Sequence, residues 1–116
     1  MIAVIFEVIP HADQKEDYFK IAAALKPTLE KIDGFISIER FQSINNPDKI
    51  LSLSFWKDEE SIKAWRSLEL HRTAQSKGRG SIFKDYHLRI ADVCRDYGMF
   101  DRAAAPADSK ETHDKL

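Results

Sequence analysis

The sequence is poor in the residues that anchor metals, disulfides and membrane spans. It has one cysteine, Cys94, which excludes an internal disulfide and any metal site built from several cysteines. Its longest apolar run, residues 2–9, is far shorter than the roughly 20 residues that cross a bilayer, and it lacks the basic lead-in of a signal peptide. We therefore expect a soluble protein of the reducing cytoplasm.

An excess of charge of either sign is also missing. Lysine and arginine number 18, aspartate and glutamate number 19, and the net charge is -1. No basic field therefore favours nucleic acid or an anionic membrane as a partner. The sequence also has no metal-ligand spacing, no phosphate-binding glycine loop and no nucleophile elbow. The 116 residues are enough for one domain with a single core.

The apolar pattern predicts four strands and two helices. The strands are expected at residues 2–9, 35–43, 50–56 and 86–95, and the helices at residues 13–32 and from residue 59 onward. Gly34 is typical of a helix end, and Asp58 is typical of a helix N-cap. The resulting β-α-β-β-α-β order is the α+β ferredoxin-like arrangement, in which an antiparallel sheet carries both helices on one face.

The pattern also predicts a boundary and a partner. Residues 1–97 should form the domain, whereas in residues 98–116 aromatic and β-branched residues nearly vanish, which favours a C-terminal arm or a disordered tail. The second face of the sheet would carry apolar side chains that nothing in this chain remains to cover. We therefore expect a homodimer formed through the sheet faces.

Several segments, in this order and spacing, resemble the antibiotic biosynthesis monooxygenase family of dimeric α+β barrels. They are the opening strand IAVIFEV, the hairpin end LSLSFW, the helix start DEESIKAW, His71 and the closing strand, so the resemblance covers roughly residues 1–97. It implies one pocket per subunit, between helices and sheet. Family members include oxygenases that oxidise polycyclic phenols or quinols without metal or flavin, a branch that binds and degrades haem, and proteins without a known activity.

The haem-degrading branch is similar in having an Asn on the first strand, a Trp on the second helix and a His ligand further along that helix. Trp65 falls where that Trp would be. The ligand position falls near Gln75, however, and the first-strand position near Phe6 or Glu7. These departures disfavour haem, so we expect no cofactor and no metal.

The polar and aromatic residues that follow the third strand are the candidate site. The candidate catalytic residues are His71 and Arg72, and the candidate substrate-binding residues are Trp56, Trp65, Gln75, Arg79, Phe83 and Tyr86. An imidazole titrates near neutrality, so His71 could take a phenolic proton. The donors of Arg72 or Arg79 could hold the resulting oxyanion, although these cations could equally complement a helix C-terminus.

The aromatic candidates have a structural alternative. Trp65 continues the helical stripe of Ile62, so core packing would explain it without any function. Trp65, Phe83 and Tyr86 could also wall a dry pocket, and Trp56 could line that pocket or meet a partner subunit. The sequence thus predicts a cofactor-independent monooxygenase acting on a small aromatic, phenolic or quinol-type molecule. The alternatives are a non-catalytic binding protein of the same fold and a haem-binding or haem-degrading enzyme.

Overall fold

A computed structural model describes residues 1–77 and 82–113, and of residues 69–77 it describes the backbone only. The elements, in chain order, are β1 (Ile2–Pro10), the 3-10 turn η1 (Ala12–Gln14), α1 (Lys15–Glu30), β2 (Phe35–Gln42), β3 (Ile50–Trp56), α2 (Glu59–Lys77), β4 (Phe83–Asp92) and α3 (Ala107–His113). The first helix begins slightly later than the sequence predicted, because a 3-10 turn precedes it. The last strand begins three residues earlier than predicted.

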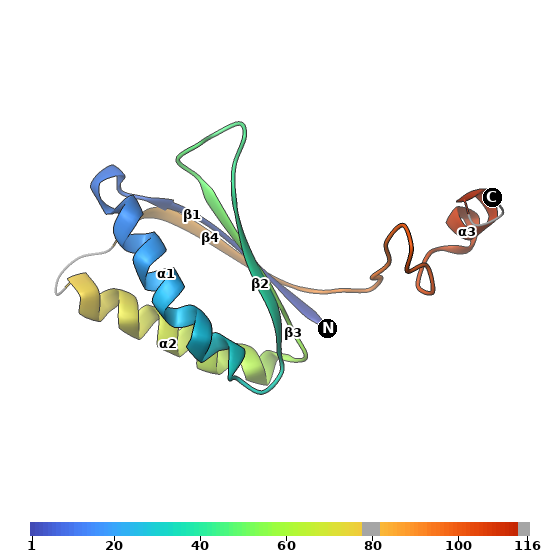
Figure 1. The fold of residues 1–116 in the computed structure, drawn as a ribbon, viewed down its shortest axis with the longest axis horizontal. Helices are drawn as coiled ribbons and strands as arrows, with labels where there is room; N and C mark the ends of the chain where they lie inside the picture. The colour runs from blue at the N-terminus through green and yellow to red at the C-terminus, as the bar shows by residue number, and fades with distance from the viewer. Residues whose placement is uncertain (78–81, 114–116) are drawn as a thin grey trace.

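The four strands form one sheet in the order β2-β3-β1-β4, and every neighbouring pair is antiparallel. Helices α1 and α2 lie side by side against one face of this sheet (Figure 1). The chain is therefore an α+β protein with the ferredoxin-like fold, which confirms the prediction. We call the sheet face that carries no helix the open face.

Strand β3 shows the two faces most clearly. Ser52, Ser54 and Trp56 are buried beneath the helices, whereas Leu51, Leu53 and Phe55 alternate with them and are half-buried on the open face. The cross-strand register extends this alternation to the neighbouring strands, since directly paired residues share a face.

The regular alternation of side chains breaks at the start of β2. The sequence pattern groups Phe35 with Ser37, but the register shifts between these two residues and leaves Ile36 as an extra residue. Phe35 consequently lies on the helix side, where its ring centroid is 5.2 Å from that of Trp56. The displaced Ile36 is 52% exposed.

The core lies between the helices and the sheet in two neighbouring clusters. One consists of Ile2, Val4, Leu29, Trp56, Ile62 and Trp65. The other consists of Phe6, Val8, Tyr18, Ile50 and Ile82. Leu88 packs against both clusters and links them. Strand β1 contributes alternate residues to both, which explains why its apolar pattern is so continuous: its other side chains form part of the open face.

The start of α2 is fixed by hydrogen bonds within its first turn and by a contact with Gly34, at the end of the α1–β2 loop. The Oδ1 atom of Asp58 accepts hydrogen bonds from the backbone N–H of Ser61 at 3.0 Å and from its Oγ at 2.7 Å, so the predicted N-cap is confirmed. These bonds lower the pKa of Asp58 below its ordinary value, because they favour the ionised carboxylate. The backbone N–H of Lys57 donates to the carbonyl of Gly34 at 2.7 Å, and Gly34 has a φ of 91°.

Beyond β4 the chain leaves the sheet and forms an arm that ends in α3 (Figure 1). Arg102 organises this arm: Nη1 donates to the Gly98 carbonyl at 3.3 Å, Nη2 donates to Ser109 Oγ at 2.6 Å, and the guanidinium lies 5.3 Å from the ring centroid of Tyr97. Met99 and Phe100 are largely exposed. The domain boundary near residue 97 stays a prediction.

Of the helices described, none is long and apolar enough to cross a membrane.

Gly34 is the position where a single methyl group should do most damage. A Cβ there would collide with the Ser61 side chain and would hold a non-glycine residue at positive φ. We expect Gly34→Ala to lower the free energy of unfolding by at least about 1–3 kcal/mol in urea denaturation. Gly98→Ala is the matched control, because a Cβ at Gly98 meets nothing within 4 Å. Equal stability of the two variants would show that the contact between Gly34 and Ser61 is not tight.

Candidate functional site

Trp65 is the candidate site residue with the best-defined surroundings. It projects from α2 into the core and is only 4% exposed. Its ring meets Phe6 of β1 edge-on, with centroids 6.5 Å apart and an interplanar angle of 81°. It also meets Trp56 of β3 at 6.2 Å. Trp65 therefore lies where α2 crosses the two central strands, as the helical spacing from Ile62 predicted.

The two indole N–H groups of this cluster differ in a way that bears on function. The Nε1 atom of Trp56 donates to Ser54 Oγ at 2.9 Å, so that buried donor is satisfied within β3. The Nε1 atom of Trp65 is buried and has no acceptor among the residues that the structure describes. An unsatisfied buried donor costs about 1–3 kcal/mol, so a ligand oxygen placed at Trp65 would recover that free energy.

Phe6 joins Trp65 to the other aromatic candidates. Its ring centroid lies 5.8 Å from that of Phe83 and 5.7 Å from that of Tyr86, and Phe83 and Tyr86 are 5.9 Å apart. The structure thus brings Trp56, Trp65, Phe83 and Tyr86 into one connected aromatic cluster. Phe6 is its central member, and the sequence analysis did not propose it as a site residue. The period-two pattern of Ile2, Val4, Phe6 and Val8 is the signal that could have found it.

Trp56 is fully buried and lies on the helix side of β3. The sequence left two roles open for Trp56, a pocket wall or a contact with a partner subunit. Its position on the helix side is compatible with a pocket wall, and it rules out contact with a partner through the open face. Trp56 packs against Phe35 of β2 and Trp65 of α2, so it lies between the sheet and the first turns of α2.

Four polar candidates cannot be placed in the same detail. His71, Arg72 and Gln75 belong to α2, but their side chains lie outside the described residues. Arg79 lies outside the described residues altogether. Their roles stay predictions. Within the parts of the chain that are described, no group of three or more His, Cys, Asp or Glu side chains could hold a metal ion.

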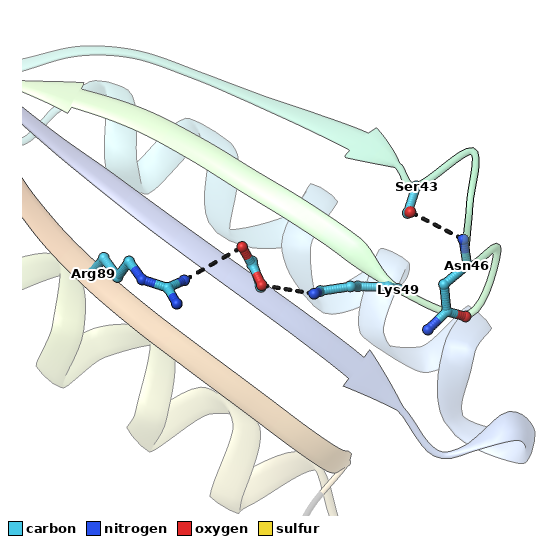
Figure 2. Close-up of polar contacts among 5 residues, drawn as sticks. Ser43, Asn46, Lys49 and Arg89 are labelled. Atoms are coloured by element: carbon cyan, nitrogen blue, oxygen red, sulfur yellow. Dashed lines mark hydrogen bonds and ion pairs between the residues drawn. The ribbon is translucent and has the colours of Figure 1, made fainter.

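Glu7, the neighbour of Phe6, faces the opposite way. On the open face its carboxylate is 2.7 Å from Lys49 Nζ and 3.4 Å from Arg89 Nη1, and Figure 2 shows these two cations approaching from opposite sides. The hydrogen bond from Lys49 is the main reason why the pKa of Glu7 is lowered. Of the two residues that could match the first-strand Asn of the haem-degrading branch, only Phe6 therefore contacts Trp65.

A helix-covered antiparallel sheet with an aromatic interior cluster defines an α+β ferredoxin-like domain with a candidate small-molecule site. Comparison with known proteins specifies the family. The model of the family "Antibiotic biosynthesis monooxygenase" matches residues 1–77, so the chain belongs to the antibiotic biosynthesis monooxygenase family, as its sequence predicted.

Two curated relatives match by sequence. Jasmonate monooxygenase ABM of Pyricularia oryzae is 50% identical over 93 residues, which are 80% of this chain and 43% of that protein. The chain thus spans less than half the length of this relative. The uncharacterized protein YqjZ of Bacillus subtilis is 26% identical over 93 residues, which are 80% of this chain and 79% of that protein.

Solved structures share the fold at low sequence identity. A putative antibiotic biosynthesis monooxygenase from Deinococcus radiodurans has a TM-score of 0.70 at 9% identity, covering 84% of this chain and 97% of the other. SnoaB of Streptomyces nogalater, a cofactor-independent oxygenase, has a TM-score of 0.65 at 7% identity, covering 82% and 94%. The haem-degrader MhuD of Mycobacterium tuberculosis, with two haems in its active site, has a TM-score of 0.63 at 15% identity, covering 84% and 100%.

Proposed function

We propose that this protein is a monooxygenase that oxidises a small organic molecule without metal or flavin, in a pocket bordered by Trp65. The observation that carries the proposal is the buried Trp65 N–H, which has no acceptor among the described residues and lies within an aromatic cluster. Family membership and the name of the Pyricularia relative support oxygen chemistry. The oxygenase and haem-degrader structures share so little sequence with this chain that they support the fold alone.

The chemistry needs little from the protein beyond a dry pocket, a base and an oxyanion donor. The base removes a proton from an electron-rich phenol or enol, and the resulting anion passes one electron to molecular oxygen. The superoxide and substrate radical then combine at carbon. When the peroxide loses water, one oxygen atom remains as a carbonyl, so a CH₂ group and O₂ become C=O and H₂O. Both reducing electrons come from the substrate, which is why no cofactor is required.

In this mechanism Trp65 holds the oxyanion of the substrate. An N–H donor that is preorganised in an apolar site stabilises developing negative charge far better than water does. Phe6, Phe83 and Tyr86 supply the apolar wall against which a flat substrate packs. We assign the base to His71 and additional oxyanion donors to Arg72 or Arg79, on chemical grounds.

The substrate class has two candidates. The aromatic cluster suits a small aromatic, phenolic or quinol-type molecule, which is the class that the mechanism favours. The name of the Pyricularia relative makes jasmonate the second candidate. A non-catalytic protein that sequesters a ligand in the same pocket is the alternative function, and it predicts binding without oxygen consumption.

Oxygen uptake tests this proposal. With quinols and jasmonate tried in parallel, we expect the protein to consume oxygen with at least one of them and to release the oxidised product. Trp65→Phe should lower kcat by about 100-fold, because it removes the oxyanion donor and retains most of the ring. Trp56→Phe is the control, because the indole N–H that it removes already donates to Ser54. This substitution should lower stability, and it should reduce kcat much less than Trp65→Phe does. Binding of these compounds without oxygen uptake would favour the sequestering protein instead.

We also propose that two copies pair through their open faces. Ala3, Ile5, Leu51, Leu53 and Phe55 share that face, and no helix of the described chain covers it. Glu7 also lies on this face, where Lys49 and Arg89 neutralise it within the same subunit. The carboxylates of Glu39 and Asp85 belong to the same face by register, but they lie on the two edge strands, β2 and β4. The central strands therefore offer apolar area whose own carboxylate is paired, which favours burial against a second copy.

Sedimentation equilibrium at micromolar concentration should give twice the 13.4 kDa mass of the chain. Leu53→Glu should shift the population to monomer, because it places two symmetry-related carboxylates in an apolar contact. Ile44→Glu is the control for added charge, since Ile44 is 96% exposed in the β2–β3 loop. A clean 13.4 kDa species from the unmodified chain would refute the dimer.

We further propose that haem does not bind here as an axially ligated complex. The ligand position falls near Gln75, and the first-strand residue that meets Trp65 is Phe6, which offers no polar group to a haem ligand. Titration with haem should give only the broad absorbance of weakly associated haem. A sharp Soret band that His71→Ala abolishes would contradict this expectation.

The cellular compartment is proposed from the single cysteine. Cys94 is exposed and unpaired with another thiol. An exposed free thiol persists best in a reducing compartment, so we propose that the protein works in the cytoplasm.

A further inference from the structure

A pocket lies at the β2 edge of the sheet, and its lining includes no member of the aromatic cluster. Its volume is about 430 Å³, within the range of small-molecule sites. Residues from the first turns of α1, the end of β2 and the start of β3 line it: Lys15, Phe19, Arg40, Phe41, Gln42 and Ile50. Nothing in the proposed oxygenase mechanism uses these residues.

The charged residues that line this pocket are all positive. Lys15 and Arg40 are its two ionised residues, and no acidic side chain belongs to its lining. Arg40 makes no ion pair with any residue that the structure describes, and its buried Nε atom has no acceptor there. A guanidinium N–H that is buried without an acceptor lowers the stability of the fold, because it has lost its hydrogen bond to water. An anion bound beside Arg40 would supply that acceptor and restore the lost free energy.

Arg40 is held in place by its strand. It pairs with Ser52 across the β2–β3 ladder, and Ser52 pairs in turn with Phe6 of β1. Two strand spacings, roughly 10 Å, therefore separate the backbone of Arg40 from that of Phe6. The pocket at Arg40 is thus a separate site on the same sheet as the aromatic cluster.

The rim of the pocket is tied to the β2–β3 loop. The carbonyl oxygen of Pro47 accepts from Gln42 Nε2 at 2.8 Å and from Lys15 Nζ at 3.3 Å. The loop is braced internally, because the backbone N–H of Asn46 donates to Ser43 Oγ at 3.1 Å, as Figure 2 shows. These bonds hold the ammonium group of Lys15 at the mouth of the pocket in the absence of a ligand.

The walls are apolar. Phe19 of α1 is partly exposed at one side, and buried Ile50 forms the base. Phe41 also borders the pocket, but its pairing with Leu51 assigns its side chain to the open face. The pocket beside the start of α2 is a useful contrast, because it carries charges of both signs: Asp58, Glu59 and Glu60 line it together with Lys63 and Arg66. Two cations beside the Phe19 ring and the Ile50 side chain select a ligand that has one anionic end and an apolar body.

We propose that this pocket binds a small amphipathic carboxylate. The carboxylate sits against the Arg40 guanidinium, whose fork of donors matches its two oxygens, and Lys15 adds a second positive charge. The hydrocarbon part packs against Phe19 and Ile50. This binding does not depend on oxygenase activity and would hold equally for a non-catalytic protein.

Titration calorimetry with octanoate tests the site. We expect saturable binding of one octanoate per subunit, and binding of 1-octanol at least tenfold weaker, because the alcohol lacks the charge. Arg40→Gln should weaken octanoate binding at least tenfold and leave octanol binding unchanged. Lys15→Gln should weaken octanoate binding by a smaller factor. Arg66→Gln removes the same charge from the pocket beside the start of α2, so it should have no effect.

Three outcomes would overturn the proposal. Equal affinity of octanoate and octanol would show that charge is not recognised. Weakening by Trp65→Phe and not by Arg40→Gln would place the ligand in the aromatic cluster. Tighter binding of octyl phosphate than of octanoate would exclude a carboxylate as the preferred anion. Circular dichroism and thermal melts of each variant separate lost binding from lost folding.

Discussion

The packing of Trp65 against Phe6 and Trp56 is the contact on which both the helix layer and the candidate site depend. Few large apolar side chains attach α2 to the sheet, and within the described part of that helix Ile62 and Trp65 are its fully buried ones. Loss of a buried Trp side chain typically costs about 3–5 kcal/mol, a large share of the stability of a small domain. The same ring carries the donor that has no acceptor among the described residues, so the fold and the proposed chemistry both depend on Trp65.

The sheet serves two different tasks because successive residues point to opposite faces. On the helix side, β1 and β3 supply the aromatic floor and the small hydroxyl side chains of Ser52 and Ser54. On the open face the same strands present Ile5, Leu53 and their neighbours. A one-residue slip of β3 would exchange Ser54 with Leu53 and damage both faces together. This explains why the register is regular along the whole β1–β3 ladder.

Periodicity and helix punctuation were enough to predict the fold. The alternation in residues 50–56, the apolar run in residues 2–9, and the signals at Gly34 and Asp58 are local, and the structure retains them all. Phe35 was misplaced because a bulge depends on pairing with a distant strand, which no local pattern reveals. The importance of Phe6 and Arg40 was missed for the same reason: each acquires its surroundings only when α2 or α1 packs on the sheet.

The contact between Gly34 and Ser61 limits how the site can open. Gly34 meets the first turn of α2 in a space too small for one methyl group, and the Lys57 N–H donates to the Gly34 carbonyl, which joins the start of α2 to the end of the α1–β2 loop. Sliding of the helix along the sheet would break that hydrogen bond and this close contact. The helix can swing about its anchored end, and the displacement grows with distance from the pivot. Trp65 lies close to that pivot and His71 farther along, so such a swing would move the proposed base, His71, more than the proposed oxyanion donor, Trp65.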